Sequence, residues 1–411
     1  STTIGYTPED TELRQLSQSP YKEYPAKWTG NSCSSSPALT DWYETVKLNY
    51  GVAPDGRKDI DTLPQEFARW DTGTHYAFWR SRVVPNTWQK FKEIVSFWLS
   101  LGVDGFRYDM AEMVPVEFWS YLNAFIKSRR PDAFLMAEIY NPESYRDYLY
   151  IGKMDALYNK VGLYDTLKDI ICYEHSTDRI DWTQDTLSDI WPQMLHFMEN
   201  HDEQRIASEG FARDPQYALP AMAVSTHLND ASVMVYFGQE VGEAARENAG
   251  FGSPTRTSIF DYIGVPAFQR WVNGKRYDGG ALTPEEAALR EYYCRLLNLP
   301  IVGAFRNIHQ YNRAHTPYYN DKVYSFVRET VQEKWLVIAN FSKRDGFGFE
   351  LQVPPELLST WDLPNGSYPL SDKLYGEVQT HFHRTDSYGR MRVDIAPLQT
   401  LFFKLGVKSE K

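Results

Sequence analysis

The clearest pattern along the chain is an alternation between helix-like and strand-like hydrophobic periods, which begins near residue 84. In the segment PNTWQKFKEIVSFWLSLG, apolar side chains recur at i, i+3 and i+4 until the chain reaches Gly102. These side chains are Trp88, Phe91, Ile94, Val95 and Trp98. The spacing predicts an amphipathic helix that ends before the glycine.

Short apolar runs then alternate with amphipathic segments as far as residue 300. The apolar runs predict strands over 105–111, 133–140, 154–159, 194–200 and 231–240. Helices are predicted between and after them, for example PVEFWSYLNAFIKSR (115–129), which opens on a proline, and TPEEAALREYYCRLLNLP (283–300). Strands that alternate with helices indicate an α/β fold with a parallel sheet.

The two flanks of this region have a different texture. Residues 1–83 are rich in turn formers, as in YTPED, GNSCSSSP and APDGRKD, and show no long helical pattern. From about residue 304, β-branched and aromatic runs such as EKWLVIANFS follow one another with no helical pattern, which predicts a small antiparallel β domain. We therefore expect an irregular segment over 1–83, an α/β domain over 84–303 and a β domain over 304–411.

Composition narrows the classes of function. A chain of 411 residues exceeds the size at which one core stops growing, which agrees with more than one domain. The net charge of −11 argues against a nucleic-acid partner, which normally requires a basic face. Aromatic residues make up 15% of the chain, and they suit stacking against sugars or a tryptophan-rich core equally well.

The cysteines and the apolar runs say little more about the class of protein or its compartment. Cys33, Cys172 and Cys294 have no metal-like spacing and imply no disulfide framework. No run of 18 apolar residues predicts a membrane span, and the start STTIGYTPED does not resemble a signal peptide. These observations leave the compartment and the oligomeric state open.

Three acidic residues stand out because each follows an apolar strand. Asp109 and Glu138 are separated by one predicted strand–helix–strand step, and Asp202 lies about two such steps further on. In parallel α/β barrels, catalytic groups come from this end of several strands. One such acid alone would be explained equally well by an ion pair or a helix cap. Three in phase favour a catalytic site.

Glycosyl transfer with retention is the chemistry that needs such a set. One ionised carboxylate acts as nucleophile and one protonated acid donates a proton. Arg107 lies on the same strand face as Asp109 and should keep that carboxylate charged, whereas the apolar segment FLMAEIY around Glu138 should favour the acid form. Asp202 would stabilise positive charge on the sugar ring. His201 could hydrogen-bond sugar hydroxyls, although a lone histidine is more often structural.

These segments carry a family resemblance. GFRYD (105–109), AEIY (137–140) and FMENHDEQR (197–205) resemble, in order and spacing, three signature segments of the α-amylase family, glycoside hydrolase family 13. The resemblance implies that Asp109 is the nucleophile, Glu138 the acid/base and Asp202 the transition-state stabiliser. It also implies substrate contacts by a further set within the matched segments: Arg107, Tyr140, Asn200 and His201.

The resemblance also implies a fold. The family has a (β/α)8 TIM barrel, a domain B inserted after the third strand and a C-terminal antiparallel β-sandwich. Here only five parallel strands are predicted, residues 1–83 resemble domain B, and 304–411 resemble the sandwich. We therefore expect a partial barrel, about strands 4–8, that lacks the first three strands or is completed by another chain. An open sheet edge would leave the activity of this chain alone in question.

Two departures from the family pattern bear on specificity. Residues 1–104 lack the Asp-to-Asn-His segment that often supplies a calcium ligand, and Glu112 and Met113 stand where amylases often have Lys-His. Structural calcium is therefore only weakly supported, and the chemistry requires no cofactor. Glu112 places a carboxylate where acceptor sugars would bind. The sequence thus predicts a retaining hydrolase of α-1,4-glucans, with a glucan transglycosylase or an inactive glycan-binding relative as alternatives.

Overall fold

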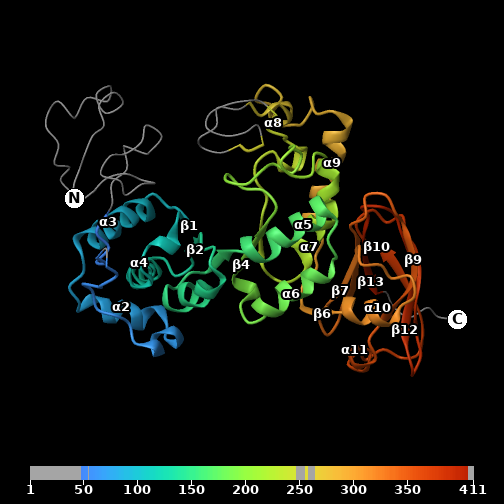
Figure 1. Cartoon of the computed structure of the whole chain (residues 1–411), viewed down its shortest axis with the longest axis horizontal. Coiled ribbons are helices and arrows are strands. Elements are labelled where there is room, and N and C mark those ends of the chain that lie inside the picture. Colours follow the sequence, from blue (N-terminus) through green and yellow to red (C-terminus); the bar gives the residue numbers. More distant parts are fainter. Residues whose placement is uncertain (1–47, 54, 247–254, 258–263, 406–411) are drawn as a thin grey trace. The chain divides into compact units, whose positions relative to one another are not determined.

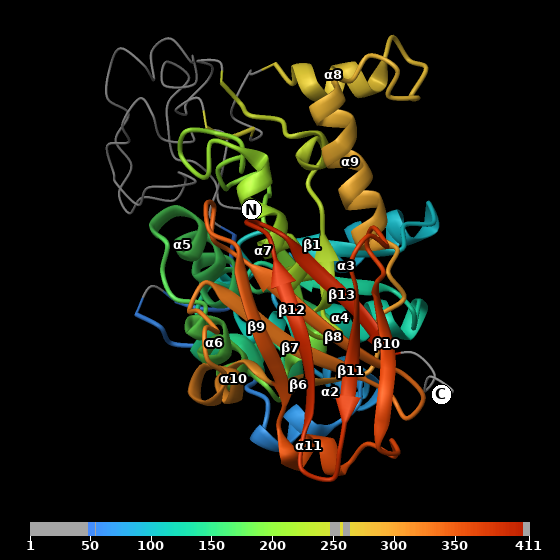
Figure 2. The same cartoon turned by 90° about the vertical axis from the view of Figure 1, so that its right-hand side faces the viewer.

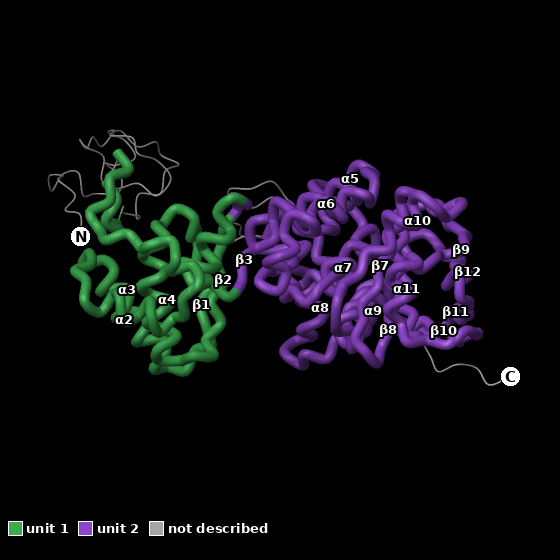
Figure 3. The backbone as a smooth tube through the Cα atoms, turned by 90° about the horizontal axis from the view of Figure 1, so that it is seen from below, with its two compact units in different colours: residues 1–139, 143–155 green, residues 140–142, 156–411 purple. Residues whose placement is uncertain are grey.

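The chain divides into two compact units, which Figure 3 distinguishes by colour. The computed structural model describes residues 48–53, 55–246, 255–257 and 264–405. One unit comprises residues 1–139 and 143–155, and the other comprises residues 140–142 and 156–411. Of the predicted irregular segment, residues 1–47 and 54 lie outside the described residues. The three predicted parts of the chain stay a prediction.

The described part of the first unit is built around two parallel strands joined by a helix (Figure 1). Its elements are α2 (Thr72–Arg80), α3 (Asn86–Ser100), β1 (Gly105–Tyr108), α4 (Val116–Arg129) and β2 (Phe134–Ala137), with short turns of helix at η2 (Gln65–Arg69), η3 (Ala111–Met113) and η5 (Asp147–Ile151). A side chain at Gly105 would place Cβ 2.0 Å from the carbonyl oxygen of Phe134, so glycine is needed where the strands pair.

The predicted helix after residue 85 and the strand–helix–strand step that follows are confirmed as α3, β1, α4 and β2. The apolar stripe of α3 is only partly buried within the described residues. Trp88 and Val95 are in the core, whereas Ile94 and Trp98 are 48% and 46% exposed. Trp88 packs against Trp79, Phe118 and Tyr121, which ties α3 to α2 and α4.

Helix α2 is a helix of nine residues within 1–83, where the sequence predicts no long helical pattern. Its N-terminus is capped by Asp71, which accepts a hydrogen bond of 2.7 Å from the N–H of Thr74. Its buried face consists of His75 and Trp79 alone. The His75 ring bonds to the hydroxyl of Ser120 on α4 at 2.7 Å. A stripe that contains a histidine and one tryptophan carries too little apolar signal to be recognised from spacing.

The second unit begins with three parallel strands, paired in the order β3, β4, β5. Its first elements are β3 (Ala156–Tyr158), η6 (Lys160–Tyr164), α5 (Asp165–Tyr173), α6 (Asp178–Leu187), β4 (Met194–Phe197), α7 (Leu219–His227), β5 (Ser232–Met234), α8 (Pro266–Val272) and α9 (Pro284–Leu297). The three remaining predicted strands and the helix at 283–300 are confirmed. Thr283 and Glu286 cap α9 reciprocally, side chain to backbone, at 3.2 and 3.0 Å.

An eight-stranded antiparallel sheet follows in the same unit (Figure 2). Its order is β6-β7-β8-β13-β10-β11-β12-β9. The elements are β6 (Ala304–Asn307), α10 (His309–His315), β7 (Val323–Glu329), β8 (Lys334–Asn340), β9 (Phe347–Val353), α11 (Pro355–Ser359), β10 (Gly366–Asp372), β11 (Gln379–Arg384), β12 (Gly389–Ile395) and β13 (Thr400–Leu405). Side chains from β7 to β13 meet in one hydrophobic core. The predicted antiparallel sheet is therefore confirmed, whereas a separate β domain over 304–411 and its sandwich architecture stay predictions.

Helices α10 and α11 show that the prediction of no helix after residue 304 was wrong. The buried face of α10 is polar. His309 bonds to Asp178 of α6 at 2.7 Å and to the Tyr319 hydroxyl at 2.9 Å, and Asn312 donates to the carbonyl of Gln352 at 2.8 Å. A helix held by buried polar contacts leaves no hydrophobic period to read. None of the described helices has the length and apolar content needed to cross a membrane.

Buried histidines make the second unit sensitive to acid. Burial lowers the pKa of His196 on β4 and of His227 on α7 to about 4 from the ordinary 6.5. Between these values the unfolded chain binds more protons than the folded one, so stability falls as pH falls through this window, by about 1.4 kcal/mol per pH unit for each such group.

We expect the urea midpoint to fall between pH 6.5 and pH 4, and to fall less in His227→Gln than in the parent. His315 is exposed, so His315→Gln should keep the parent's pH dependence. Equal pH dependence in the parent and in His227→Gln would contradict the assignment.

Candidate active site

Two of the predicted acids lie together at the carboxyl ends of β1 and β2. The strands pair in parallel with Tyr108 opposite Ala137, so Asp109 and Glu138 are the next residues in register. The N–H of Glu138 donates to the carbonyl of Tyr108 at 3.1 Å, which extends the ladder to the site. Parallel pairing thus delivers two carboxylates from adjacent strands to one edge.

One guanidinium contacts both carboxylates. Arg107 places Nη1 2.6 Å from Oδ1 of Asp109 and Nη2 3.2 Å from Oε2 of Glu138. The shared face of Arg107 and Asp109 that the sequence predicts is therefore confirmed. The guanidinium offsets the repulsion between two negative charges on neighbouring strands.

The two acids have different surroundings. The Asp109 side chain is 73% exposed, whereas that of Glu138 is 11% exposed. Oε2 of Glu138 also accepts a hydrogen bond of 2.9 Å from the N–H of Met110, which has a left-handed backbone (φ 44°). The setting of Glu138 is buried, as predicted, but less apolar than its sequence neighbours indicate. Its role as a proton donor stays a prediction.

The third acid lies in the second unit, on the loop after β4. Oδ1 of Asn200 accepts the N–H groups of Asp202 and Glu203, both at 2.8 Å, and so shapes the turn. His201 places Nε2 3.1 Å from Oδ2 of Asp202. Asn200 is buried (1% exposed), which gives it a structural contact within the turn, and its predicted contact with substrate stays a prediction.

Sequence reasoning missed the ion pair that closes this loop. Arg205 is fully buried, and its Nη1 donates to Oε2 of Glu199 at 2.7 Å and to the carbonyl of Phe237 at 2.8 Å. Its Nε donates to the Thr257 hydroxyl at 3.1 Å, and Oε1 of Glu199 accepts the N–H of Ile206 at 2.6 Å. The loop that carries Asn200, His201 and Asp202 is therefore tied to the end of β5 and to residue 257.

Aromatic rings cover this buried pair. The guanidinium of Arg205 lies 4.5 Å from the ring centroid of Tyr236 and 4.9 Å from that of Phe237. Burial raises the pKa of Glu199 to about 7, and the neighbouring Arg205 opposes that rise. The signal available in the sequence was the opposite charges at the two ends of ENHDEQR, within an otherwise apolar context.

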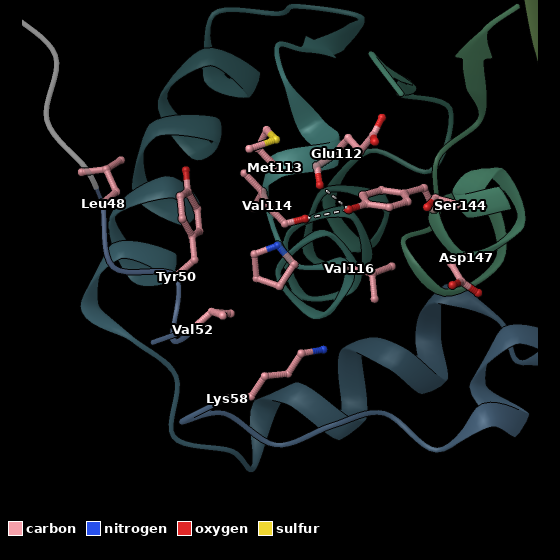
Figure 4. A pocket seen from close by; sticks show the side chains of 12 residues that line it. Leu48, Tyr50, Val52, Lys58, Glu112, Met113, Val114, Val116, Ser144 and Asp147 are labelled. Carbon is pink, nitrogen blue, oxygen red and sulfur yellow. Dashed lines mark hydrogen bonds between the residues drawn. The ribbon is translucent and has the colours of Figure 1, made fainter. Parts of the chain in front are cut away.

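A cavity of about 580 Å³ lies within the first unit, beside Glu112. Figure 4 shows Glu112, Met113 and Val114 on one side of it and Tyr50, Val52 and Lys58 on another.

One buried tyrosine supports the cavity wall. The hydroxyl of Tyr148 lies 2.9 Å from the carbonyl oxygen of Glu112 and 3.0 Å from that of Val114. Burial raises the pKa of Tyr148 to about 12, so the phenol remains a donor to this segment at neutral pH. The loop that follows Asp109 is therefore supported from behind.

The structure thus forms two groups from the predicted site residues. Arg107, Asp109, Glu112 and Glu138 belong to the first unit. Tyr140, which is half-buried, belongs to the second unit with Asn200, His201 and Asp202. That the three acids surround one pit stays a prediction. Among the described residues, no three His, Cys, Asp or Glu side chains group as metal ligands.

Comparison with known proteins identifies the family. A model of the α-amylase catalytic domain matches residues 78–264, which include Arg107, all three acids and the Glu199–Arg205 pair. Residues 78–264 belong to the α-amylase family. The resemblance stated from the sequence is therefore confirmed.

Relatives of this amylase-family segment have varied activities. Neopullulanase 2 of Thermoactinomyces vulgaris is 24% identical over 157 residues, which cover 37% of this chain and 26% of that protein. Alpha-amylase 3 of Dictyoglomus thermophilum is 22% identical over 311 residues, 69% of this chain and 60% of the relative. The α-1,4-glucan:maltose-1-phosphate maltosyltransferase of Burkholderia pseudomallei is 30% identical over 108 residues, which cover 26% of this chain and 8% of that protein. The chain spans less than two thirds of each relative.

Solved amylase structures share the fold. The α-amylase of Geobacillus thermoleovorans, in complex with acarbose, aligns with a TM-score of 0.54 and 17% identity over 80% of this chain and 66% of that chain. A maltogenic α-amylase of Thermotoga neapolitana aligns with a TM-score of 0.54 and 17% identity, over 78% of this chain and 66% of that chain. At this identity the likeness concerns the fold alone.

The Glu199–Arg205 pair allows a stability prediction. Arg205→Met leaves the Glu199 carboxylate buried without its partner, which should cost about 3–5 kcal/mol of unfolding free energy. The double variant Glu199→Gln/Arg205→Met removes the stranded charge and should recover part of the loss.

Urea unfolding at pH 8, above the pKa of Glu199, measures both effects. Arg213→Met, an exposed arginine, serves as the control and should stay within about 0.5 kcal/mol of the parent. A double variant less stable than Arg205→Met would contradict the account.

Proposed function

We propose that this chain carries the catalytic centre of a retaining glycosidase that cleaves α-1,4 bonds in starch-like glucans. The observation that supports this most directly is the Arg107 guanidinium between the carboxylates of Asp109 and Glu138. Neighbouring strands lie about 4.8 Å apart, and a retaining mechanism places its two carboxyl groups about 5–5.5 Å apart. Residues in register on paired parallel strands suit that spacing.

The difference in exposure between the two acids supports the two roles that we propose for them. Asp109 is open to solvent and contacts the Arg107 guanidinium, and in this proposal it attacks the anomeric carbon while Glu138 gives a proton to the departing glycosidic oxygen. A covalent glycosyl-aspartate results. Glu138 then removes a proton from water, whose oxygen displaces Asp109 and restores the original anomeric configuration.

Asp202 completes the set in this proposal. Its carboxylate, which lies 3.1 Å from Nε2 of His201, would stabilise the positive charge that develops at the sugar ring. The proposed architecture is a partial (β/α) barrel over 84–303 between a domain-B-like segment (1–83) and a C-terminal β-sandwich (304–411). The proposed chemistry requires no cofactor. Structural calcium stays a weak expectation.

Transglycosylation is the second candidate function. Glu112 borders the cavity beside the Asp109 loop, where an acceptor sugar would compete with water for the glycosyl-aspartate. The relatives include both an α-amylase and an α-1,4-glucan:maltose-1-phosphate maltosyltransferase. The inactive glycan-binding alternative is disfavoured because all three acids are present.

Maltoheptaose with product chromatography tests the proposal. Glu138→Gln should lower turnover by about 100- to 10,000-fold, the usual contribution of a general acid–base group, and Asp109→Asn should lower it at least as much. Products only shorter than maltoheptaose indicate hydrolysis, and longer ones indicate transfer.

Asp104 offers a matched control because it lies at the opposite end of β1 with a 90% exposed side chain. Asp104→Asn should retain the parent's turnover. If Asp109→Asn also retained it, the assignment of the nucleophile would be wrong.

A further inference from the structure

A second cavity lies in the second unit, outside every residue of the proposed active site. It has a volume of about 570 Å³, within the range of about 300–1,000 Å³ that small-molecule sites occupy. Its wall combines the end of α5, the loop at 209–214, the start of the next helical turn and the tight turn between β8 and β9. Segments far apart in sequence therefore build it.

The charged side chains of the cavity are balanced in sign and do not pair. Three acids and three bases line it: Glu174, Glu209, Asp214, Arg213, Lys343 and Arg344. Within the part of the chain that the structure describes, none of the six makes an ion pair. Four of the six, Glu174, Glu209, Arg213 and Arg344, are exposed to solvent, and a bound ligand could therefore reach them.

Two tyrosines add apolar faces with polar edges. Tyr173 is 70% exposed at the end of α5, and Tyr217 is half-buried, with the ammonium of Lys343 4.8 Å from its ring centroid. Such rings bind the C–H faces of sugars while hydroxyls reach charged neighbours. A ligand with many hydroxyl groups and no net charge matches this wall better than an anion or a cation does.

Two residues of the wall have left-handed backbone. Glu174 (φ 54°) ends α5, where this conformation is common, whereas Arg213 (φ 67°) lies in the loop and is not glycine. The N–H of Arg213 donates to the carbonyl of Ser208 at 3.0 Å, which keeps the turn in place. Strain of this kind tends to occur where side chains must be presented to a ligand.

We propose that this cavity binds a stretch of α-glucan chain, away from the catalytic acids. The choice of α-glucan rests on the proposed function, whereas the preference for a neutral polyhydroxylated ligand rests on the cavity itself. A second binding site for the same polymer would raise the local concentration of substrate chains near the enzyme. Cleavage of short oligosaccharides would not depend on it.

Native electrophoresis through gels with and without amylopectin tests the site. Arg213→Gly removes the guanidinium at a position whose backbone suits glycine, so folding should be preserved. We expect the apparent Kd for amylopectin to rise about tenfold, the lower end of what losing a charged hydrogen-bond donor costs. Tyr173→Ala should act in the same direction, and turnover of maltotriose should stay unchanged in both.

The chain offers matched controls. Lys275 is an exposed cation with φ 72° outside the cavity, so Lys275→Gly should leave retardation unchanged. Tyr318 is 85% exposed and lies outside the cavity, so Tyr318→Ala is the control for Tyr173→Ala and should leave retardation unchanged. If Arg213→Gly and Lys275→Gly were retarded equally, or if sulfated dextran but not amylopectin retarded the parent, the site would be refuted.

A thiol inside the cavity gives a second readout. Cys172 lines the cavity and Cys294 does not, and both are half-buried. Maltoheptaose should slow the alkylation of Cys172 by iodoacetamide, measured by peptide mass spectrometry, and leave Cys294 unaffected. Protection of neither cysteine would overturn the proposal.

Failure of the cavity and failure of the proposed function give different results. If the parent cleaves maltoheptaose but binds amylopectin independently of Arg213, the catalytic assignment stands and the cavity proposal is wrong. If the parent shows Arg213-dependent retardation and no cleavage, the cavity proposal stands and the catalytic assignment is wrong.

Discussion

The edge formed by β1 and β2 depends on one cation, Arg107, that is shared by two acids. Parallel pairing of β1 and β2 brings Asp109 and Glu138 to the same edge, where their charges would repel each other. Arg107, two residues before Asp109 on the same strand face, contacts both carboxylates and makes that arrangement stable. One acid remains open to solvent and the other is buried, so a single register and a single guanidinium produce two acids with different environments, as the proposed double displacement requires.

The second unit uses a buried ion pair for a related purpose. The segment that carries Asp202 belongs to no helix or strand, and its shape comes from the Asn200 turn and from the pair formed by Glu199 and Arg205. Because both charges are removed from water, each depends on the other, and the aromatic rings around the guanidinium keep solvent out. The loop is thereby held without a regular backbone ladder.

Sequence reasoning recovered what periodicity and local motifs encode. It found all five parallel strands, α3, α4 and α9, and it placed Arg107 and Asp109 on one face. It missed α2 and α10, because their buried faces rely on His75 and on His309 and Asn312, which carry no hydrophobic signal. It also missed Arg205, the contact from Met110 to Glu138, and the unpaired charges of the second cavity. Such features arise from backbone direction and from contacts between distant segments, which spacing alone does not encode.

Azide rescue with α-maltosyl fluoride tests most directly whether Asp109 and Glu138 have the distinct, complementary roles proposed for them. In Asp109→Gly, azide should attack the anomeric carbon in place of the lost carboxylate, release fluoride and yield the β-azide. In Glu138→Gly, fluoride leaves without protonation, Asp109 forms the glycosyl ester, and azide displaces it to yield the α-azide. Opposite anomers from the two variants are the predicted result. The same anomer from both, or azide products from neither, would contradict the account.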